Sequence, residues 1–172
     1  MIEAEGYRFN FQDAIDVLKF DERNPSSSTF HDAPMKAVDL IVEFEREYLF
    51  VEVKEYPSSY SPEMRIQNTE CDQVDCPYRI NHFTWLKNYL KYKYRDTYLF
   101  RYAEGKIDKP VYYLCLLNFD DAQNSVMQQQ LYRELPVGLA SKRWVKELVK
   151  KCQVLNLSAW NRNFPKWPVE KL

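Results

Sequence analysis

The sequence predicts an α/β protein in which a mixed central sheet is flanked by helices, and three observations support this prediction. Two strand-like runs, at 37–44 and 47–56, follow each other directly and are rich in β-branched, aromatic and other apolar residues. Apolar and aromatic residues recur at three- and four-residue spacing over 78–102, which is typical of a long helix. The run VYYLCLLNF at 111–119 is almost wholly apolar, as in a strand that is buried on both faces.

The chain has 172 residues, a usual size for one domain, and we expect a single domain over 1–172. No stretch approaches the roughly 18 apolar residues of a membrane span, and MIEAEGYRF lacks the basic start and apolar run of a signal peptide. We therefore expect a cytoplasmic protein with no membrane partner. The cysteines are expected to be reduced, with the third of them in the core: Cys71, Cys76, Cys115 and Cys152.

The remaining elements are predicted from caps and breakers. Asn10 is suited to cap a first helix over 11–22, and Asn-Pro-Ser-Ser-Ser-Thr at 24–29 ends it. Residues 57–77 contain three prolines and many polar groups, so we expect a loop that borders a site. Two helices and a short strand should follow the buried strand, at 122–134, 141–152 and 153–157. The aromatic tail beyond them is expected to cover the protein's own core.

The net charge of −1 hides an asymmetry between the two halves of the chain. Residues 1–86 contain 8 basic and 17 acidic side chains, whereas residues 87–172 contain 16 and 8, so the halves have net charges of −9 and +8. A basic half can attract phosphate while an acidic half gathers a divalent cation. The alternative, that solvated helix faces merely differ in composition, stays open.

Burial predicts the register of the hairpin. If Glu45 and Arg46 form a two-residue turn, paired residues have numbers that sum to 91, and one face consists mostly of apolar pairs. The other face pairs Asp39 with Glu52, and Lys54 follows on the same side. A slip by one residue would mix polar and apolar side chains on both faces. Because Glu-Arg is not a favoured turn sequence, a longer turn stays open.

The facing carboxylates of Asp39 and Glu52 predict a metal site. Two such groups repel each other unless a proton or a cation intervenes. Their oxygens suit Mg²⁺ or Mn²⁺, and Lys54 would place a positive charge near a phosphate or an attacking water. The same three residues could instead form a cross-strand ion pair without a metal.

The stretch AVDLIVEFEREYLFVEVKEY resembles the core motif of the PD-(D/E)xK, or restriction-endonuclease-like, nuclease superfamily. The resemblance implies the family's αβββαβ core, here with additional C-terminal helices, and metal-dependent hydrolysis of a phosphodiester. In that comparison Asp39 resembles the shared metal-binding acid, Glu52 the second ligand, and Lys54 the lysine that orients the water. The backbone carbonyl of Val53 would complete the site. The expected partner is nucleic acid, with DNA as the first choice.

Several features of the resemblance stay open. Many members of the superfamily add an acid from the first helix, and Asp13 and Asp16 are available here. Endonuclease and exonuclease activity are not distinguished by these residues. The alternatives to an active nuclease are a non-catalytic nuclease-like binding or assembly module and a subunit that is active only within a larger complex. A homodimer or a larger nuclease complex is the assembly to be considered.

Two basic segments, KNYLKYKYR at 87–95 and SKRWVKELVKK at 141–151, interleave aromatic residues with Lys and Arg. This pattern is expected of surfaces that contact a nucleic-acid backbone and stack on bases, although plain solvated helix faces can have it too. The residues predicted to bind nucleic acid are Lys87, Lys91, Lys93, Arg95, Lys142 and Arg143.

Competing sites are poorer matches to known chemistry. A zinc site at Cys71, Cys76 and His82 lacks a fourth ligand and has non-standard spacing. His31 and Asp32 could assist proton transfer, but such a pair in a loop is more often incidental. The sequence has no Gly-x-Ser-x-Gly elbow and no Gly-rich phosphate loop, which argues against a serine hydrolase and a nucleotide-binding loop.

Overall fold

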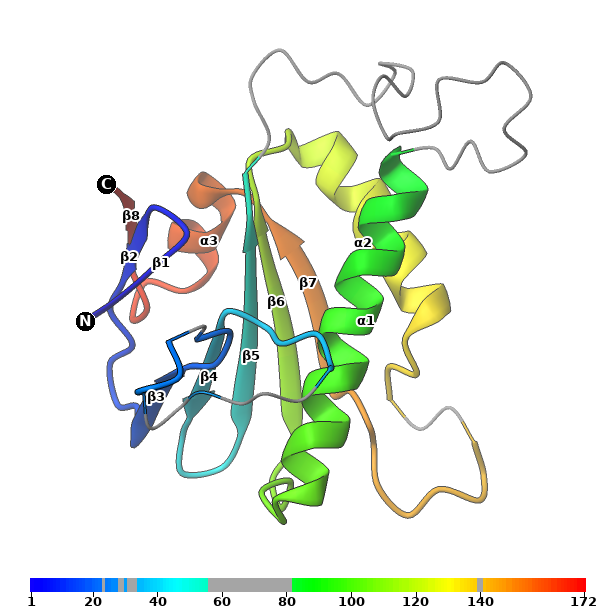
Figure 1. Ribbon diagram of the computed structural model, residues 1–172. Coiled ribbons are helices and arrows are strands. Elements are labelled where there is room, and N and C mark those ends of the chain that lie inside the picture. The colour runs from blue at the N-terminus through cyan, green and yellow to red at the C-terminus, as the bar shows by residue number, and fades with distance from the viewer. Residues whose placement is uncertain (23, 28–29, 31–33, 56–81, 139–140) are drawn as a thin grey trace, which may run out of the picture.

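The computed structural model describes residues 1–22, 24–27, 30, 34–55, 82–138 and 141–172, and has a mixed α/β architecture (Figure 1). Its main sheet has five strands in the order β3-β4-β5-β6-β7, which are Asp16–Lys19, Leu40–Glu43, Tyr48–Lys54, Val111–Leu117 and Lys151–Leu155. β3, β4 and β5 are antiparallel neighbours, whereas β5, β6 and β7 are parallel. A small sheet has the order β1-β2-β8, formed by Ile2–Ala4, Tyr7–Phe9 and Val169–Lys171.

Helices cover both faces of the main sheet in the described part of the chain. α1 (His82–Ala103) and α2 (Asp121–Glu134) lie on one face, and α3 (Leu157–Asn163) lies with the small sheet on the other (Figure 1). The strands therefore send alternate side chains into two apolar clusters, which explains the nearly continuous hydrophobicity of β6. None of the described helices has the length and apolar character needed to cross a membrane.

The β4–β5 hairpin has the predicted register, because paired residues such as Ile41 and Phe50 have numbers that sum to 91. The backbone N–H of Phe44 donates to the carbonyl of Glu47 at 2.9 Å, which closes the two-residue turn. Neither residue of that turn has a positive φ. The turn therefore differs from the primed types that most two-residue hairpins use, in keeping with its Glu-Arg sequence.

The predicted first helix over 11–22 is wrong, because this segment leads into the edge strand β3. Neighbouring carbonyls take the backbone donors: the N–H of Asn10 donates to Pro168 at 3.1 Å, and the N–H of Ile15 donates to Glu43 at 2.7 Å. β3 then adds to the free edge of β4. Long-range strand pairing has thus outweighed a local helical pattern.

The helix predicted over 141–152 is also wrong. Its described residues form turns and bends, and Val149 makes a parallel bridge with Val137. β7 then begins two residues before the predicted strand at 153–157 and lies beside β6. The edge of β6 has backbone N–H and C=O groups that need a partner strand. Pairing of β7 with this edge satisfies the backbone groups of both strands, which a helix would satisfy internally.

The aromatic tail covers the protein's own core, as predicted. Trp160 on α3 is fully buried, and its Nε1 donates to the carbonyl of Trp167 at 2.7 Å. The Trp160 ring also packs edge-on against Phe9 of the small sheet. Cys115 and Cys152 are buried free thiols, so the prediction of a core position for Cys115 is confirmed.

α1 fixes the chain that enters β4. The backbone N–H of Lys36 donates to Asp96 Oδ2 and that of Val38 donates to Thr97 Oγ1, each at 2.9 Å. Thr97 is completely buried, and it lies one helical turn beyond Lys93 on the same side of α1. These contacts therefore set the position of Asp39, the residue directly after Val38, relative to α1.

Replacing Thr97 by the isosteric valine should lower the free energy of unfolding by about 1–3 kcal/mol, because the N–H of Val38 would be left buried without an acceptor. Urea denaturation measures this change. Thr84→Val on the same helix is the matched control and should change stability by less than about 0.5 kcal/mol. Equal effects of the two substitutions would contradict the anchoring role of Thr97.

Candidate metal centre

Asp39 lies directly before β4 and is only 2% exposed. Its Oδ2 accepts the backbone N–H of Val53 at 2.6 Å, and its own carbonyl accepts the N–H of Phe20 at 2.9 Å. Asp39 is therefore held between the two strands, by its backbone carbonyl at the end of β3 and by its carboxylate at the end of β5. The predicted hairpin register led to this position, since it sets Asp39 opposite Glu52.

Glu52 lies on β5 with its side chain under α1 and is 1% exposed. Neither of its carboxylate oxygens accepts a well-aligned hydrogen bond in the described structure. A buried carboxylate without hydrogen-bond donors is costly unless a cation compensates it. Glu52 thus identifies a place where positive charge is required.

Lys93 supplies one such charge from α1. Its Nζ lies 3.2 Å from Glu52 Oε1 and 3.5 Å from Asp39 Oδ1, and the residue is 7% exposed. The contact with Glu52 has the distance of an ion pair without the alignment of a hydrogen bond. Lys93 was predicted to bind nucleic acid at the surface, and the structure places it instead between the two buried acids.

Burial has the largest effect on the pKa values of Asp39 and Glu52. It raises the pKa of Asp39 to about 7, against the opposing effects of the Lys93 ammonium and the Val53 N–H. Burial and then the Asp39 carboxylate raise the pKa of Glu52 well above its usual value. Burial alone would lower the pKa of Lys93, but the Glu52 and Asp39 carboxylates outweigh it and raise that pKa. A cation that binds here must displace protons from the acids.

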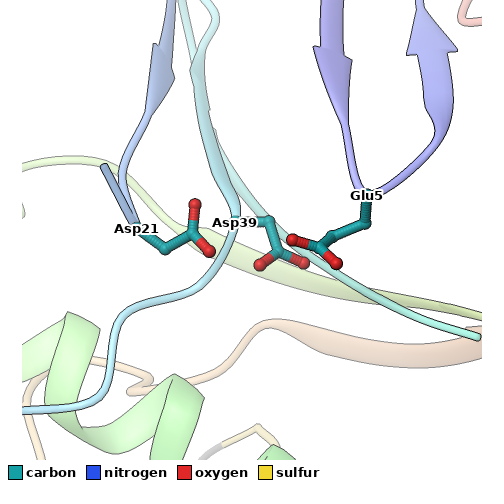
Figure 2. Close-up of side chains that lie close together, drawn as sticks. All are labelled: Glu5, Asp21 and Asp39. Carbon is teal, nitrogen blue, oxygen red and sulfur yellow. The ribbon is translucent and has the colours of Figure 1, made fainter. Parts of the chain in front are cut away.

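Three carboxylates from distant parts of the chain meet at Asp39. Glu5, Asp21 and Asp39 each offer an oxygen, and these oxygens all lie within 4.8 Å of one another. Figure 2 shows the three side chains directed toward one another from the β1–β2 turn, the segment after β3 and the segment before β4. Asp21 also helps to raise the pKa of Glu52, so the cluster and the buried acid are electrostatically connected.

Glu5 reaches the cluster because of an unusual turn. It has φ 48° and is followed by Gly6 with φ 80°, and the residues on either side, Ala4 and Tyr7, are paired. Two positive φ values define a turn of the primed type, and the left-handed region is unfavourable for a residue other than glycine. The alternating apolar residues around Glu-Gly could have revealed this hairpin in the sequence.

The acids considered for the first helix lie elsewhere. Asp13 is exposed and pairs with Lys166 at 3.5 Å, and Asp16 accepts the N–H of Val17 at 2.9 Å. Neither belongs to the acidic cluster found among the described residues. Asp21, which the sequence reasoning did not select, joins Asp39 in their place.

Lys54 and Val53 lie at the end of β5, next to the acids. Lys54 is half-buried, and its Nζ lies 5.6 Å from the ring centroid of Tyr89, with no ion-pair partner among the described residues. Val53 contributes its N–H to Asp39. The predicted roles of the Lys54 ammonium and the Val53 carbonyl stay predictions.

Most of the basic residues predicted to bind nucleic acid have intramolecular partners. Lys87 and Lys91 pair with the Glu134 carboxylate at 2.7 and 3.1 Å, and Arg95 donates to the Glu134 carbonyl at 2.9 Å. These contacts join α1 to the end of α2. The remaining two, in the loop before β7, are exposed: Lys142 and Arg143.

Two alternative sites lie outside the described residues. They are the zinc site that would use Cys71 and Cys76, and the proton-transfer pair His31 and Asp32. The side chain of His82 is likewise not described.

The acids that gather around Asp39 fit a divalent metal ion: Glu5, Asp21, Asp39 and Glu52. Their donors are all carboxylate oxygens, which suit hard cations such as Mg²⁺, Mn²⁺ or Ca²⁺. Glu52 is buried beside Asp39 with unsatisfied oxygens, and Asp39 also belongs to the three-acid cluster with Glu5 and Asp21, which does not include Glu52. Comparison of the chain with family models, with curated proteins and with solved structures finds no match.

Proposed function

We propose that this protein is a metal-dependent nuclease of the PD-(D/E)xK type that hydrolyses phosphodiester bonds, with DNA as the first substrate to test. The observation that carries the proposal is the buried pair of Asp39 and Glu52, in which the Glu52 oxygens accept no hydrogen bond among the described residues and a lysine lies at 3.2 to 3.5 Å. The order β3-β4-β5-α1-β6 supports it, since three antiparallel strands, a helix and a parallel strand correspond to the βββαβ part of the family's core.

Asp39 and Glu52 are the proposed ligands, with Asp21 and Glu5 as further acids and the Val53 carbonyl as a neutral donor. Mg²⁺ or Mn²⁺, when bound, would act as a Lewis acid on the phosphate and lower the pKa of a bound water. The protein's own contribution is to bury the carboxylates of Asp39 and Glu52, whereas Glu5 is exposed and Asp21 is partly exposed. Asp39 is central because it accepts a hydrogen bond from Val53 of β5 and also belongs to the acidic cluster.

The two lysines have separate proposed roles. Hydrolysis joins a water oxygen to phosphorus, breaks the bond from phosphorus to the leaving sugar oxygen, and returns a proton to that oxygen. Lys54, whose ammonium has no described carboxylate partner, would stabilise the negative charge that develops on the phosphate. Lys93 would keep the two carboxylates in place and balance their charge.

One observation favours a second candidate function. Because Lys93 already compensates Asp39 and Glu52, the site can be stable without a metal ion, as an ion-pair network inside a non-catalytic binding module. The two functions differ in a simple way. A nuclease requires the divalent cation, whereas the binding module does not.

The test is cleavage of labelled single- and double-stranded DNA with Mg²⁺, with Mn²⁺ and with a chelator. We expect cleavage only with a metal ion, and a loss of about 10²- to 10³-fold in rate for Lys54→Met with unchanged thermal stability. Lys166→Met, at an exposed position near Asp13, is the matched control. Equal rates for wild type and Lys54→Met would remove the role given to Lys54, and no metal-dependent cleavage would leave the binding module.

A further inference from the structure

A stripe of aromatic side chains runs along one side of α1. Trp85, Tyr89 and Tyr92 are spaced by four and three residues, so they share one side of the helix. Trp85 is 41% exposed and Tyr92 is 45% exposed, and the rings of Trp85 and Tyr89 stack at 5.1 Å with an angle of 18° between their planes. We call these three residues the aromatic stripe.

Three lysine ammonium groups surround the middle ring of the aromatic stripe. The Nζ atoms of Lys36, Lys54 and Lys93 lie 4.8, 5.6 and 5.3 Å from the Tyr89 centroid. Lys93 is neutralised by the buried acids, but no ion pair is formed by Lys36 or Lys54 within the described residues. Two positive charges therefore remain for an external anion beside the stripe.

The aromatic stripe is continuous with the candidate metal centre. Tyr89 lies within 5.3 Å of the Lys93 ammonium, which in turn contacts Glu52 and Asp39. Lys36 lies close to the Tyr92 ring as well, with Nζ 6.0 Å from its centroid. A chain bound along the stripe would thus carry its anionic groups past the two unpaired lysines to the acids.

We propose that the aromatic stripe, with Lys36 and Lys54, binds a single-stranded polynucleotide, with bases on the exposed rings and phosphates at the lysines. This inference rests on the proposed nuclease function and specifies its substrate class. Single strands present the faces of their bases, which stack on aromatic side chains irrespective of sequence, whereas a duplex hides those faces. The ammonium groups of Lys36 and Lys54, which lie over the Tyr89 ring and have no ion-pair partner among the described residues, complement the phosphates of the same strand.

Fluorescence anisotropy of the full chain tests this binding in the presence of a chelator, so that no cleavage occurs. The probes are oligo-dT and oligo-rU of about 20 nucleotides, and a DNA duplex of the same length. We expect tighter binding of a single strand than of the duplex. The comparison of oligo-dT with oligo-rU shows which of these two single strands binds more tightly.

Trp85→Ala and Tyr92→Ala should each weaken single-strand binding by about five- to a hundredfold, the contribution of one stacked base. Lys36→Ala should reduce the slope of log affinity against log salt by about 0.7. Tyr102→Ala, at a 65% exposed position on the same helix, and Lys166→Ala are the controls and should bind as wild type. Melting temperatures verify that each variant is folded.

The inference is overturned if the duplex binds at least as tightly as both single strands, or if the stripe variants bind like Tyr102→Ala. Failure of the nuclease proposal looks different, because it leaves single-strand binding intact while cleavage with Mg²⁺ or Mn²⁺ is absent. Asp39→Asn separates the two further. It should reduce cleavage by about 10³-fold and retain binding of the single strand in the chelator.

Discussion

Lys93→Met should lower the free energy of unfolding of the metal-free protein by about 3–5 kcal/mol at pH 7.5, the usual cost of removing one partner from a buried ion pair. Methionine has a similar length and no charge, so the cavity term is small. Asp39 and Glu52, which are 2% and 1% exposed, would lose the cation that lies within 3.5 Å of both. Urea denaturation in a chelator measures the change.

The loss of stability in Lys93→Met should depend on pH in a definite direction. Burial raises the folded-state pKa of Asp39 to about 7, above its unfolded value of 3.8, so the folded protein holds a proton that the unfolded chain releases. Stability from this group is therefore fully present below the unfolded pKa and is lost as pH rises through about 7. Removing the ammonium strengthens this effect, because the cation that favours the carboxylate is gone.

Lys54→Met is the matched control for Lys93→Met, since it removes a lysine ammonium that has no described ion-pair partner. It should change the free energy of unfolding by less than about 0.5 kcal/mol both at pH 4.5 and at pH 7.5. We expect a small difference between Lys93→Met and wild type near pH 4.5 and a large one at pH 7.5. A Lys93→Met variant that is as stable as Lys54→Met at pH 7.5 would contradict the placement of Lys93 between the acids.

Asp39→Asn should reduce metal-dependent DNA cleavage by about 10³-fold, because several kcal/mol of transition-state stabilisation depend on the bound cation. The substitution preserves the shape of the side chain, and an amide oxygen can still accept the Val53 N–H, so the fold should persist. Single-turnover rates at saturating Mg²⁺ measure the loss. Excess metal should restore little of the activity, since the substitution removes a ligand.

Asp13→Asn is the control for Asp39→Asn, because Asp13 is an exposed acid whose carboxylate pairs with Lys166 outside the acidic cluster. It should cleave at the wild-type rate. Equal activity of Asp39→Asn and Asp13→Asn, with both folded, would remove Asp39 from the proposed mechanism.

The sequence predicted the part of the site that depends on local pairing. The hairpin register follows from burial alone, since shifting it by one residue would move a whole set of side chains to the other face. That register places Asp39 beside β5, where its carboxylate accepts the N–H of Val53. The long helix and the buried strand were predictable because each has a strong and unambiguous periodicity.

The other members of the site depend on long-range contacts. Lys93 lies in KNYLKYKYR with basic neighbours, and only the crossing of α1 over the sheet separates it from the surface lysines. Asp21 and Glu5 come from an edge strand and a tight turn, whose packing against Asp39 is not encoded in their local sequence. Sequence patterns therefore identified Asp39 and Glu52. They did not identify Lys93, which compensates the charge of these two acids, or Asp21 and Glu5, which complete the acidic cluster.

The two wrong helices have a common cause. Both segments, at 11–22 and 141–152, have helical spacing of apolar residues, but each lies at an edge of the main sheet, next to β4 or β6. The strands β3 and β7 take up only part of these segments and satisfy their backbone by pairing with such an edge, while Ile15 and Val145 are 63% and 97% exposed. The intrinsic helix propensity of these residues is a small effect compared with the strand pairing that the main sheet makes possible.

The most direct test of the central claim is a calorimetric titration of the full chain with Mn²⁺ at pH 7.5, compared with Asp39→Asn. We predict saturable binding to wild type with proton release, seen as a heat that depends on the buffer, because the cation displaces protons from the buried acids. Asp39→Asn should bind Mn²⁺ at least tenfold more weakly, because loss of even an outer-shell partner of a metal ligand typically costs about 10- to 100-fold in affinity. Absence of Mn²⁺ binding to the wild type, or binding that Asp39→Asn leaves unchanged, would contradict the account of a metal centre at Asp39 and Glu52.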